Sequence, residues 1–167
     1  MRYAQIRKMD ISNGEGIGVA LFTQGCPFHC KGCFNPETWN YNGGKEWTKE
    51  IEEYFLSLIK PEHIERITFL GGEPLIEENL TDLKRLIKKI KQSFDNKKIW
   101  IYSGNTFEKM SKKQLEVLSL ADILVDGPFI LEEKNLNIPF RGSTNQRIID
   151  IQKTFKKGEI ILYNTIK

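Results

Sequence analysis

The sequence has no long apolar run and little cysteine. No stretch approaches the ~20 consecutive apolar residues of a membrane-spanning helix. The N-terminal residues lack the apolar core of a secretory signal, so we expect a cytoplasmic protein that does not enter a membrane. A net charge of +3 is too small to predict nucleic-acid binding. Repeats, linkers and low-complexity tracts are also missing, so residues 1–167 are predicted to form a single domain.

The cysteines of the chain are concentrated in one short segment. Cys26, Cys30 and Cys33 are the only three, and they form the pattern C-x3-C-x2-C. Three clustered thiols cannot all pair with one another, which argues against a disulfide framework. Soft thiolate ligands placed this close together favour zinc or an iron–sulfur cluster instead.

Three interpretations of this cysteine loop differ in the ligands that they require. The simplest is a set of reduced thiols without a metal. A structural zinc site requires four protein ligands, so His29 would be the fourth, although no second Cys or His pair follows elsewhere in the chain. A [4Fe–4S] cluster held by three thiolates leaves one iron open to an external ligand. The sequence favours this third interpretation because it supplies three thiols.

Apolar patterns divide the chain into alternating strands and helices. Short apolar runs bounded by turn residues predict strands, and apolar residues at helical spacing predict helices. Thr48 is expected to cap the first helix and Asn79 the second, and Ser111 with Gln114 forms a capping-box pattern before the third. The predicted strands span residues 2–9, 19–22, 64–70, 99–102, 121–125 and 159–163.

Chemically informative residues follow these predicted strands. They are the cysteine loop, Gly-Gly-Glu-Pro at 71–74, Ser-Gly at 103–104 and Asp-Gly at 126–127. Alternating strands and helices predict a parallel sheet, and such sheets bind ligands at the carboxyl ends of their strands. A complete eight-stranded barrel usually needs ~250 residues, so the predicted α/β fold is an incomplete parallel (β/α) barrel of about five or six strands.

Longer motifs resemble a known enzyme family. C-x3-C-x2-C followed by Phe34 resembles the signature of the radical S-adenosylmethionine (SAM) enzymes, whose barrels are also incomplete. Over residues 1–150 the chain is similar to the activating proteins of anaerobic (class III) ribonucleotide reductases. It departs from that family's pattern at Gly18 and Asn105, where relatives often carry arginine and tyrosine. The similarity rests on Asn-Gly-Glu-Gly at 13–16, Leu-Phe-Thr-Gln-Gly-Cys at 21–26, Cys-Phe-Asn-Pro-Glu-Thr-Trp at 33–39, Gly-Gly-Glu-Pro at 71–74, Val-Asp-Gly-Pro-Phe at 125–129 and Arg-Gly-Ser-Thr-Asn-Gln-Arg at 141–147.

The resemblance implies a radical reaction at a [4Fe–4S] cluster. Cys26, Cys30 and Cys33 would be the metal ligands and the catalytic residues, and the amine and carboxylate of SAM would chelate the remaining iron. The reduced cluster would cleave SAM to methionine and a 5′-deoxyadenosyl radical. That radical would take a hydrogen atom from a glycine of the anaerobic ribonucleotide reductase, and the protein's task would be positioning and exclusion of water.

The resemblance also implies which residues contact SAM. Phe34 would pack against the adenine, and the carbonyls of Gly71 and Gly72 would accept hydrogen bonds from the SAM ammonium. Ser103 and Asp126 are expected near the ribose or the methionine carboxylate, with ordinary turn roles as the alternative. The expected cofactor-binding residues are Gly32, Cys33, Phe34, Gly71, Gly72, Glu73, Ser103 and Asp126.

The sequence gives weaker signals for the surfaces that would bind partner proteins than for the cysteine loop. The polar residues at 141–147 would bind a carboxylate or dock the radical-bearing loop of the reductase, unless they form a solvated loop. A lysine-rich helix face would dock a flavodoxin or ferredoxin type electron donor or simply face water. The lysine-rich helix face carries Lys84, Arg85, Lys88, Lys89 and Lys91.

Three alternative functions remain open for the whole chain. They are pyruvate formate-lyase activase, 7-carboxy-7-deazaguanine synthase, and a non-catalytic iron–sulfur or zinc module.

Overall fold

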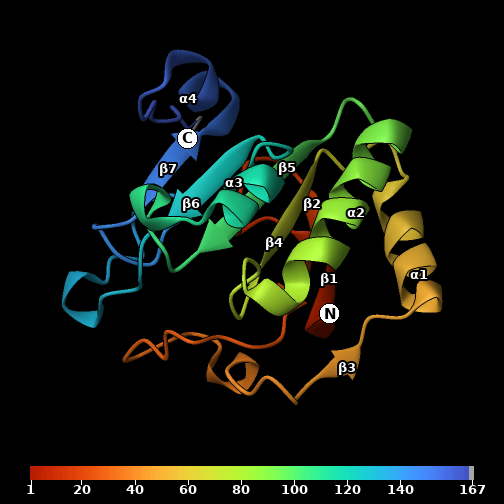
Figure 1. The fold of residues 1–167 in the computed structure, drawn as a ribbon, viewed down its shortest axis with the longest axis horizontal. Coiled ribbons are helices and arrows are strands. Elements are labelled where there is room, and N and C mark those ends of the chain that lie inside the picture. Colours follow the sequence, from red (N-terminus) through yellow and green to blue (C-terminus); the bar gives the residue numbers. More distant parts are fainter. Residues whose placement is uncertain (166–167) are drawn as a thin grey trace.

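The computed structural model describes residues 1–165, which form a seven-stranded mixed sheet and four α-helices (Figure 1). The strand order is β3-β1-β2-β4-β5-β6-β7. The strands are β1 (Arg2–Asp10), β2 (Gly18–Thr23), β3 (Lys45–Glu46), β4 (Arg66–Gly71), β5 (Lys98–Ser103), β6 (Ile123–Asp126) and β7 (Arg147–Asp150). The helices are α1 (Lys49–Ile59), α2 (Glu77–Ser93), α3 (Lys112–Leu118) and α4 (Ile151–Lys157). Within residues 1–165, no helix has the length and apolar character needed to cross a membrane.

The sheet is parallel at its centre and antiparallel at its edges. β2, β4, β5 and β6 run parallel, whereas β1, β3 and β7 each pair antiparallel with their neighbours. The predicted α/β class is therefore confirmed, but the expectation of an all-parallel sheet is wrong outside these four strands. β7 is antiparallel because residues 127–146 return the chain at the same end of the sheet, without a helical crossover.

Local signals identified most elements but missed β3, β7 and α4. Thr48 accepts a hydrogen bond from the backbone of Ile51, and the capping box at Ser111 is present, as predicted. Asn79 does not cap α2, because that helix already begins at Glu77 and buries Asn79 in its first turn. The strand predicted at 159–163 is reduced to a bridge between Leu162 and Ile149, because the unpredicted α4 turns the chain away after β7.

Alternation along the central strands gives the sheet two different faces. Alternate residues pack with α1, α2 and α3 in the main apolar core, which holds Val19, Leu21, Ile67, Phe69, Ile99, Ile101 and Leu124. The residues between them form two small clusters on the other face, which Figure 1 shows without helices at its centre. We call these the helix-covered face and the open face. The open face carries Ala20, Phe22, Leu70, Trp100, Tyr102, Ile123 and Val125.

Candidate active site

A cavity of about 510 Å³ lies over the open face of the sheet. Phe22, Leu70 and Tyr102 contribute its floor. Its walls come from the turn between β1 and β2, the cysteine loop after β2, the ends of β4 and β5, and residues 127–146. Segments far apart in the sequence therefore meet at the carboxyl ends of the parallel strands, where α/β folds bind ligands.

All three cysteines line this cavity. They are half-buried and form no disulfide. The Cys33 amide donates to the Cys30 carbonyl at 3.0 Å, and the Asn35 amide donates to the Cys33 sulfur at 3.4 Å. Amide hydrogen bonds of this kind tune thiolate ligands of iron–sulfur clusters. A set of three thiols beside an open volume fits such a cluster, and these residues could hold one.

His29 is placed differently from the cysteines around it. Its ring stacks on Trp39, with centroids 4.5 Å apart and planes 9° apart. It is not among the residues that line the cavity. Within residues 1–165, no three His, Cys, Asp or Glu side chains are grouped to hold a single metal ion. The zinc interpretation required His29 beside the thiols, and the stacking on Trp39 gives it no support.

Two consecutive glycines allow the loop after β4 to lie against the cysteine loop. Gly71 has φ +107°, and a Cβ there would lie 2.7 Å from the Cα of Phe22. A Cβ on Gly72 would lie 2.5 Å from the carbonyl oxygen of Gly25, just before Cys26. The amides of Gly72 and Glu73 donate to Thr23 and Gly25 at 2.9 and 2.8 Å. Only glycines fit this close approach, which brings both loops to one cavity.

Glu73 lines the cavity with an incompletely bonded carboxyl group. Its Oε2 accepts from the Ser103 hydroxyl at 2.8 Å and from the Gly104 amide at 3.3 Å. Its Oε1 is buried and has no hydrogen-bond partner among residues 1–165. Burial raises the pKa of Glu73 to about 8, although these hydrogen bonds oppose the shift. A ligand that donates a hydrogen bond would satisfy Oε1.

The other expected SAM contacts divide into two groups. Phe34 lines the cavity beside Phe129, with ring centroids 5.0 Å apart, and Ser103 lines it while bonded to Glu73. Gly32 is not part of the wall, and a Cβ there would lie 2.8 Å from Leu131. Asp126 is also outside the wall, because its buried carboxylate is bonded to Arg147 and to the Phe107 amide.

The cavity also has wall residues that the sequence did not single out. Arg7, Tyr102 and Phe140 are the main ones. The period-two pattern of β5 assigns Tyr102 to the face opposite Ile101, which was an available signal. Phe140 could not have been predicted, because its place depends on a left-handed backbone with φ +60°.

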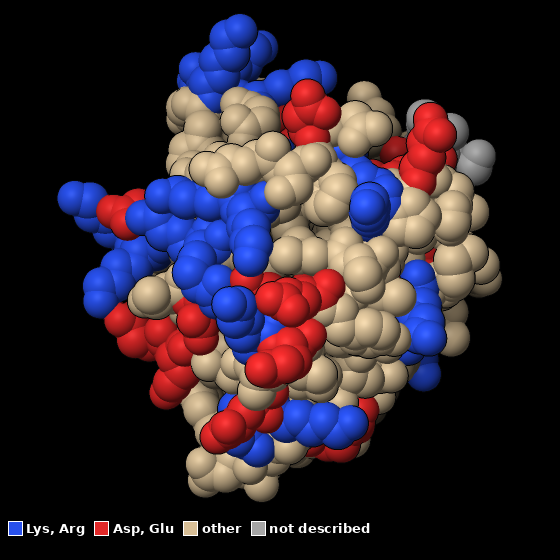
Figure 2. All heavy atoms as spheres, turned by 90° about the vertical axis from the view of Figure 1, so that its right-hand side faces the viewer, with Lys and Arg blue, Asp and Glu red and all other residues tan. Residues whose placement is uncertain are grey.

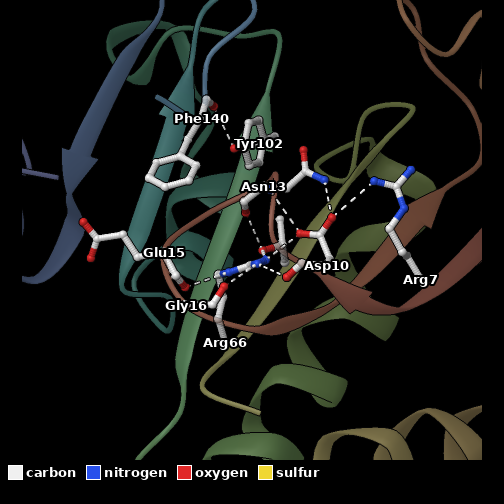
Figure 3. Close-up of polar contacts among 9 residues, drawn as sticks. Arg7, Asp10, Asn13, Glu15, Gly16, Arg66, Tyr102 and Phe140 are labelled. Atoms are coloured by element: carbon white, nitrogen blue, oxygen red, sulfur yellow. Dashed lines mark hydrogen bonds and ion pairs between the residues drawn. The ribbon is translucent and has the colours of Figure 1, made fainter. Parts of the chain in front are cut away.

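A buried ion pair holds the glycine-rich turn at the edge of the cavity (Figure 3). Arg66, which is 1% exposed, pairs with Asp10 at 3.0 Å and donates to the carbonyls of Glu15 and Gly16. Burial lowers the pKa of the Arg66 guanidinium, and Asp10 opposes that shift. Asn13 completes the network by donating to Asp10 at 2.8 Å. The sequence motif at 13–16 is thus shaped by a residue of β4.

The same arginine accounts for the space at Gly18. Gly18 pairs in register with Arg66 across β2 and β4, and a Cβ on Gly18 would lie 2.7 Å from the Arg66 guanidinium carbon. The guanidinium of Arg66 therefore fills the space beside residue 18, which has no side chain of its own. Asn105, the second departure, bonds to Lys109 and Gly127 and does not line the cavity.

Comparison with known proteins identifies the family of the chain. Residues 12–149 match the family described as a 4Fe-4S single cluster domain. The anaerobic ribonucleoside-triphosphate reductase-activating protein of Salmonella typhi is 36% identical over 148 residues, which are 87% of this chain and 96% of that protein. The proteins of the same name from Escherichia coli (strain K12) and Enterobacteria phage T4 are 35% and 37% identical; the alignments cover 87% and 89% of this chain, and 96% and 93% of those proteins. The chain therefore belongs to the family of anaerobic ribonucleoside-triphosphate reductase-activating proteins.

Proposed function

We propose that this protein activates anaerobic ribonucleotide reductase by generating its glycyl radical with a [4Fe–4S] cluster and SAM. One observation supports this most: three free cysteines and the loop at 71–73 converge on one cavity. The relatives are named for activating the reductase, and the matching family is named for a 4Fe-4S cluster. The cavity volume of about 510 Å³ lies within the ~300–1,000 Å³ that is typical of small-molecule sites.

In this proposal Cys26, Cys30 and Cys33 hold three irons and leave the fourth for SAM. Such a cluster, when bound and reduced, would supply the one electron needed to cleave SAM to methionine and a 5′-deoxyadenosyl radical, and that radical would take a hydrogen atom from a glycine of the reductase. The protein contributes position and a dry environment. The four parallel strands would correspond to part of an incomplete radical SAM barrel.

The roles of the surrounding residues follow from their places. The carbonyls of Gly71 and Gly72 would accept hydrogen bonds from the SAM ammonium, and the free Oε1 of Glu73 would accept a further one. Ser103 would orient Glu73 through their 2.8 Å hydrogen bond. Phe34 would pack against the adenine from its exposed position on the cavity wall. Asp126 would act through Arg147 and the backbone, without touching SAM.

The electron donor is proposed to be a flavodoxin or ferredoxin. The lysine-rich face of α2 is a weak docking surface for it, because most of its cations are already paired. Figure 2, which looks onto the side that carries α1 and α2, shows basic and acidic side chains next to one another. Within residues 1–165, only Lys88 of this face lacks a carboxylate partner. The pairs are Lys84–Glu116, Arg85–Glu52, Lys89–Glu52 and Lys91–Asp122.

The test is an anaerobic activation assay. The reconstituted and reduced protein is mixed with SAM and the anaerobic reductase, and an EPR spectrum is recorded while 5′-deoxyadenosine is assayed. We expect a glycyl-radical doublet in the wild-type protein. The doublet should disappear in Cys30→Ala, because this variant lacks one of the three thiolates that would hold the cluster. His29→Asn is the matched control, because asparagine tolerates the φ of +47° found at His29. It should keep both the iron and the doublet.

The other outcomes distinguish the alternatives. Deoxyadenosine without a doublet would retain SAM cleavage but point to another substrate, as for pyruvate formate-lyase activase or 7-carboxy-7-deazaguanine synthase. A full cluster that produces neither signal would indicate a non-catalytic iron–sulfur module. Zinc in place of iron, lost in His29→Asn, would restore the zinc interpretation and end this proposal.

A further inference from the structure

Arg141 differs from the other arginines of the chain in having no carboxylate partner within residues 1–165. The sequence contains six arginines. Five of them form ion pairs, namely Arg2, Arg7, Arg66, Arg85 and Arg147. Among residues 1–165, the acceptors of Arg141 are two backbone carbonyls, those of Pro139 at 3.5 Å and Gln146 at 3.3 Å. These contacts are long and leave the positive charge uncompensated.

This unpaired guanidinium belongs to the wall of the cavity that the cysteines line. Arg7 lies in the same wall, but it pairs at 3.2 Å with Asp10, a carboxylate that it shares with Arg66, and its guanidinium also lies 4.9 Å from the centre of the Phe22 ring. Within residues 1–165, Arg141 is therefore the cavity-lining arginine that has no carboxylate partner. A planar guanidinium binds a carboxylate through two parallel hydrogen bonds, so an anionic ligand of this kind matches it well.

The backbone around Arg141 is held in an uncommon conformation. Phe140, directly before it, has φ +60°, a left-handed value that bulky residues rarely adopt. The Tyr102 hydroxyl donates to the Phe140 carbonyl at 2.7 Å, as Figure 3 shows. The Phe140 ring packs edge-on against Trp100 at 5.5 Å. On the other side, the Gly142 amide donates to the Gln146 side chain at 2.8 Å. The segment that carries Arg141 is thus fixed before any ligand arrives.

The cavity therefore has two polar poles of opposite kind. One is the carboxyl group of Glu73, whose Oε1 has no partner among residues 1–165. The other is the guanidinium of Arg141, which has no counter-ion within residues 1–165. An α-amino acid group carries on one carbon an ammonium that can donate a hydrogen bond to the Glu73 side chain and a carboxylate that can accept from the Arg141 guanidinium.

We propose that Arg141 binds the α-carboxylate of SAM and makes that carboxylate a requirement for binding. This inference rests on the proposed function, because it assumes that SAM is the ligand of the cavity. Tyr102 and Phe140 act as positioning residues for the guanidinium. Loss of a hydrogen bond to a charged group corresponds to about 10- to 100-fold in affinity, so removal of Arg141 should weaken SAM binding by that factor.

The test measures binding without turnover. Cluster-reconstituted, unreduced protein is dialysed to equilibrium against radiolabelled SAM or decarboxylated SAM, which retains the ammonium and the sulfonium. The wild-type protein should bind SAM more tightly than the decarboxylated form, which lacks both the contact with Arg141 and the chelation of the open iron by the carboxylate. Arg141→Gln should bind SAM about 10- to 100-fold more weakly than the wild type does and should keep only the part of the preference that chelation provides. Arg141→Lys should recover part of the preference because it keeps the charge without the planar fork. Arg85→Gln, which removes an arginine that does not line the cavity, is the control and should keep the full preference.

Each other result has a separate meaning. Arg141→Gln that still prefers SAM by the wild-type factor would overturn the inference. Unchanged SAM binding with loss of reductase activation would also overturn it, and would assign Arg141 to the partner protein. A wild-type protein that contains the cluster but binds neither ligand would contradict the proposed function itself. Iron content and thermal unfolding of Arg141→Gln, expected to match the wild type, show that the variant is folded.

Discussion

The two faces of the central sheet bury different kinds of side chain. On the helix-covered face, Phe69 and its neighbours are apolar and contact α1 and α2. On the open face, Arg66, Thr68 and Glu73 are buried beside the cavity, and each is bonded to residues distant in the sequence. The first face is built by packing and the second by specific polar contacts. Substitutions on the first should change stability alone, whereas those on the second should also change ligand binding.

The largest effect is expected from Phe69→Ala on the helix-covered face. Phe69 is fully buried and its ring centroid lies 6.3 Å from that of Phe55. Removing a buried phenylalanine side chain leaves a cavity and lowers the free energy of unfolding by about 3–5 kcal/mol. Urea denaturation measures this loss. SAM affinity, measured at a temperature where the variant is folded, should not change. A loss of affinity as large as that of Arg141→Gln would break the distinction between the faces.

On the open face, Asp10→Asn should have the next largest effect. It leaves the buried Arg66 guanidinium without its counter-ion, and breaking such a pair costs about 3 kcal/mol. Arg7→Gln removes a partly exposed partner of the same carboxylate and should cost less than about 1 kcal/mol. Unlike Phe69→Ala, Asp10→Asn should also weaken SAM binding, because the turn at 13–16 borders the cavity. Equal unfolding energies for the two variants would show that Arg66 does not depend on Asp10.

Glu73 gives the open face a pH dependence. The folded pKa is raised to about 8 from the ordinary value of 4.5, so between these values the folded protein keeps a proton that the unfolded chain releases. The contribution of protonated Glu73 to the free energy of unfolding is therefore full below pH 4.5. It is lost as the pH rises to about 8, and the free energy of unfolding falls by up to about 1.4 kcal/mol for each pH unit. Glu73→Gln should remove this slope. Urea denaturation of the metal-free proteins between pH 6 and 8 compares them, and parallel curves would contradict the raised pKa.

The sequence identified most of the helix-covered face, apart from β7 and α4, and less of the open one. Periods of two and of about 3.6 residues, together with caps such as Thr48, identify strands and helices because each signal is local. The cysteine loop and the glycines at 71–72 were also identifiable, because the chemistry requires those residue types. Arg141 could be named only within a polar cluster. Its importance comes from the absence of a partner, which is a property of the folded chain.

A small and specific effect is expected from Tyr102→Phe. Burial raises the pKa of the Tyr102 phenol, so it remains a donor and supports the left-handed Phe140 through its carbonyl. Removing this hydrogen bond should lower the free energy of unfolding by about 1 kcal/mol. The matched control is Tyr163→Phe, because Tyr163 also packs on Trp100, at 5.9 Å, but donates to Glu15. If Tyr102 positions Arg141, only Tyr102→Phe should reduce the preference for SAM over decarboxylated SAM. An equal loss of this preference in both variants would show that Tyr102 acts only by packing. The open face would then be stabilised in the same way as the helix-covered face.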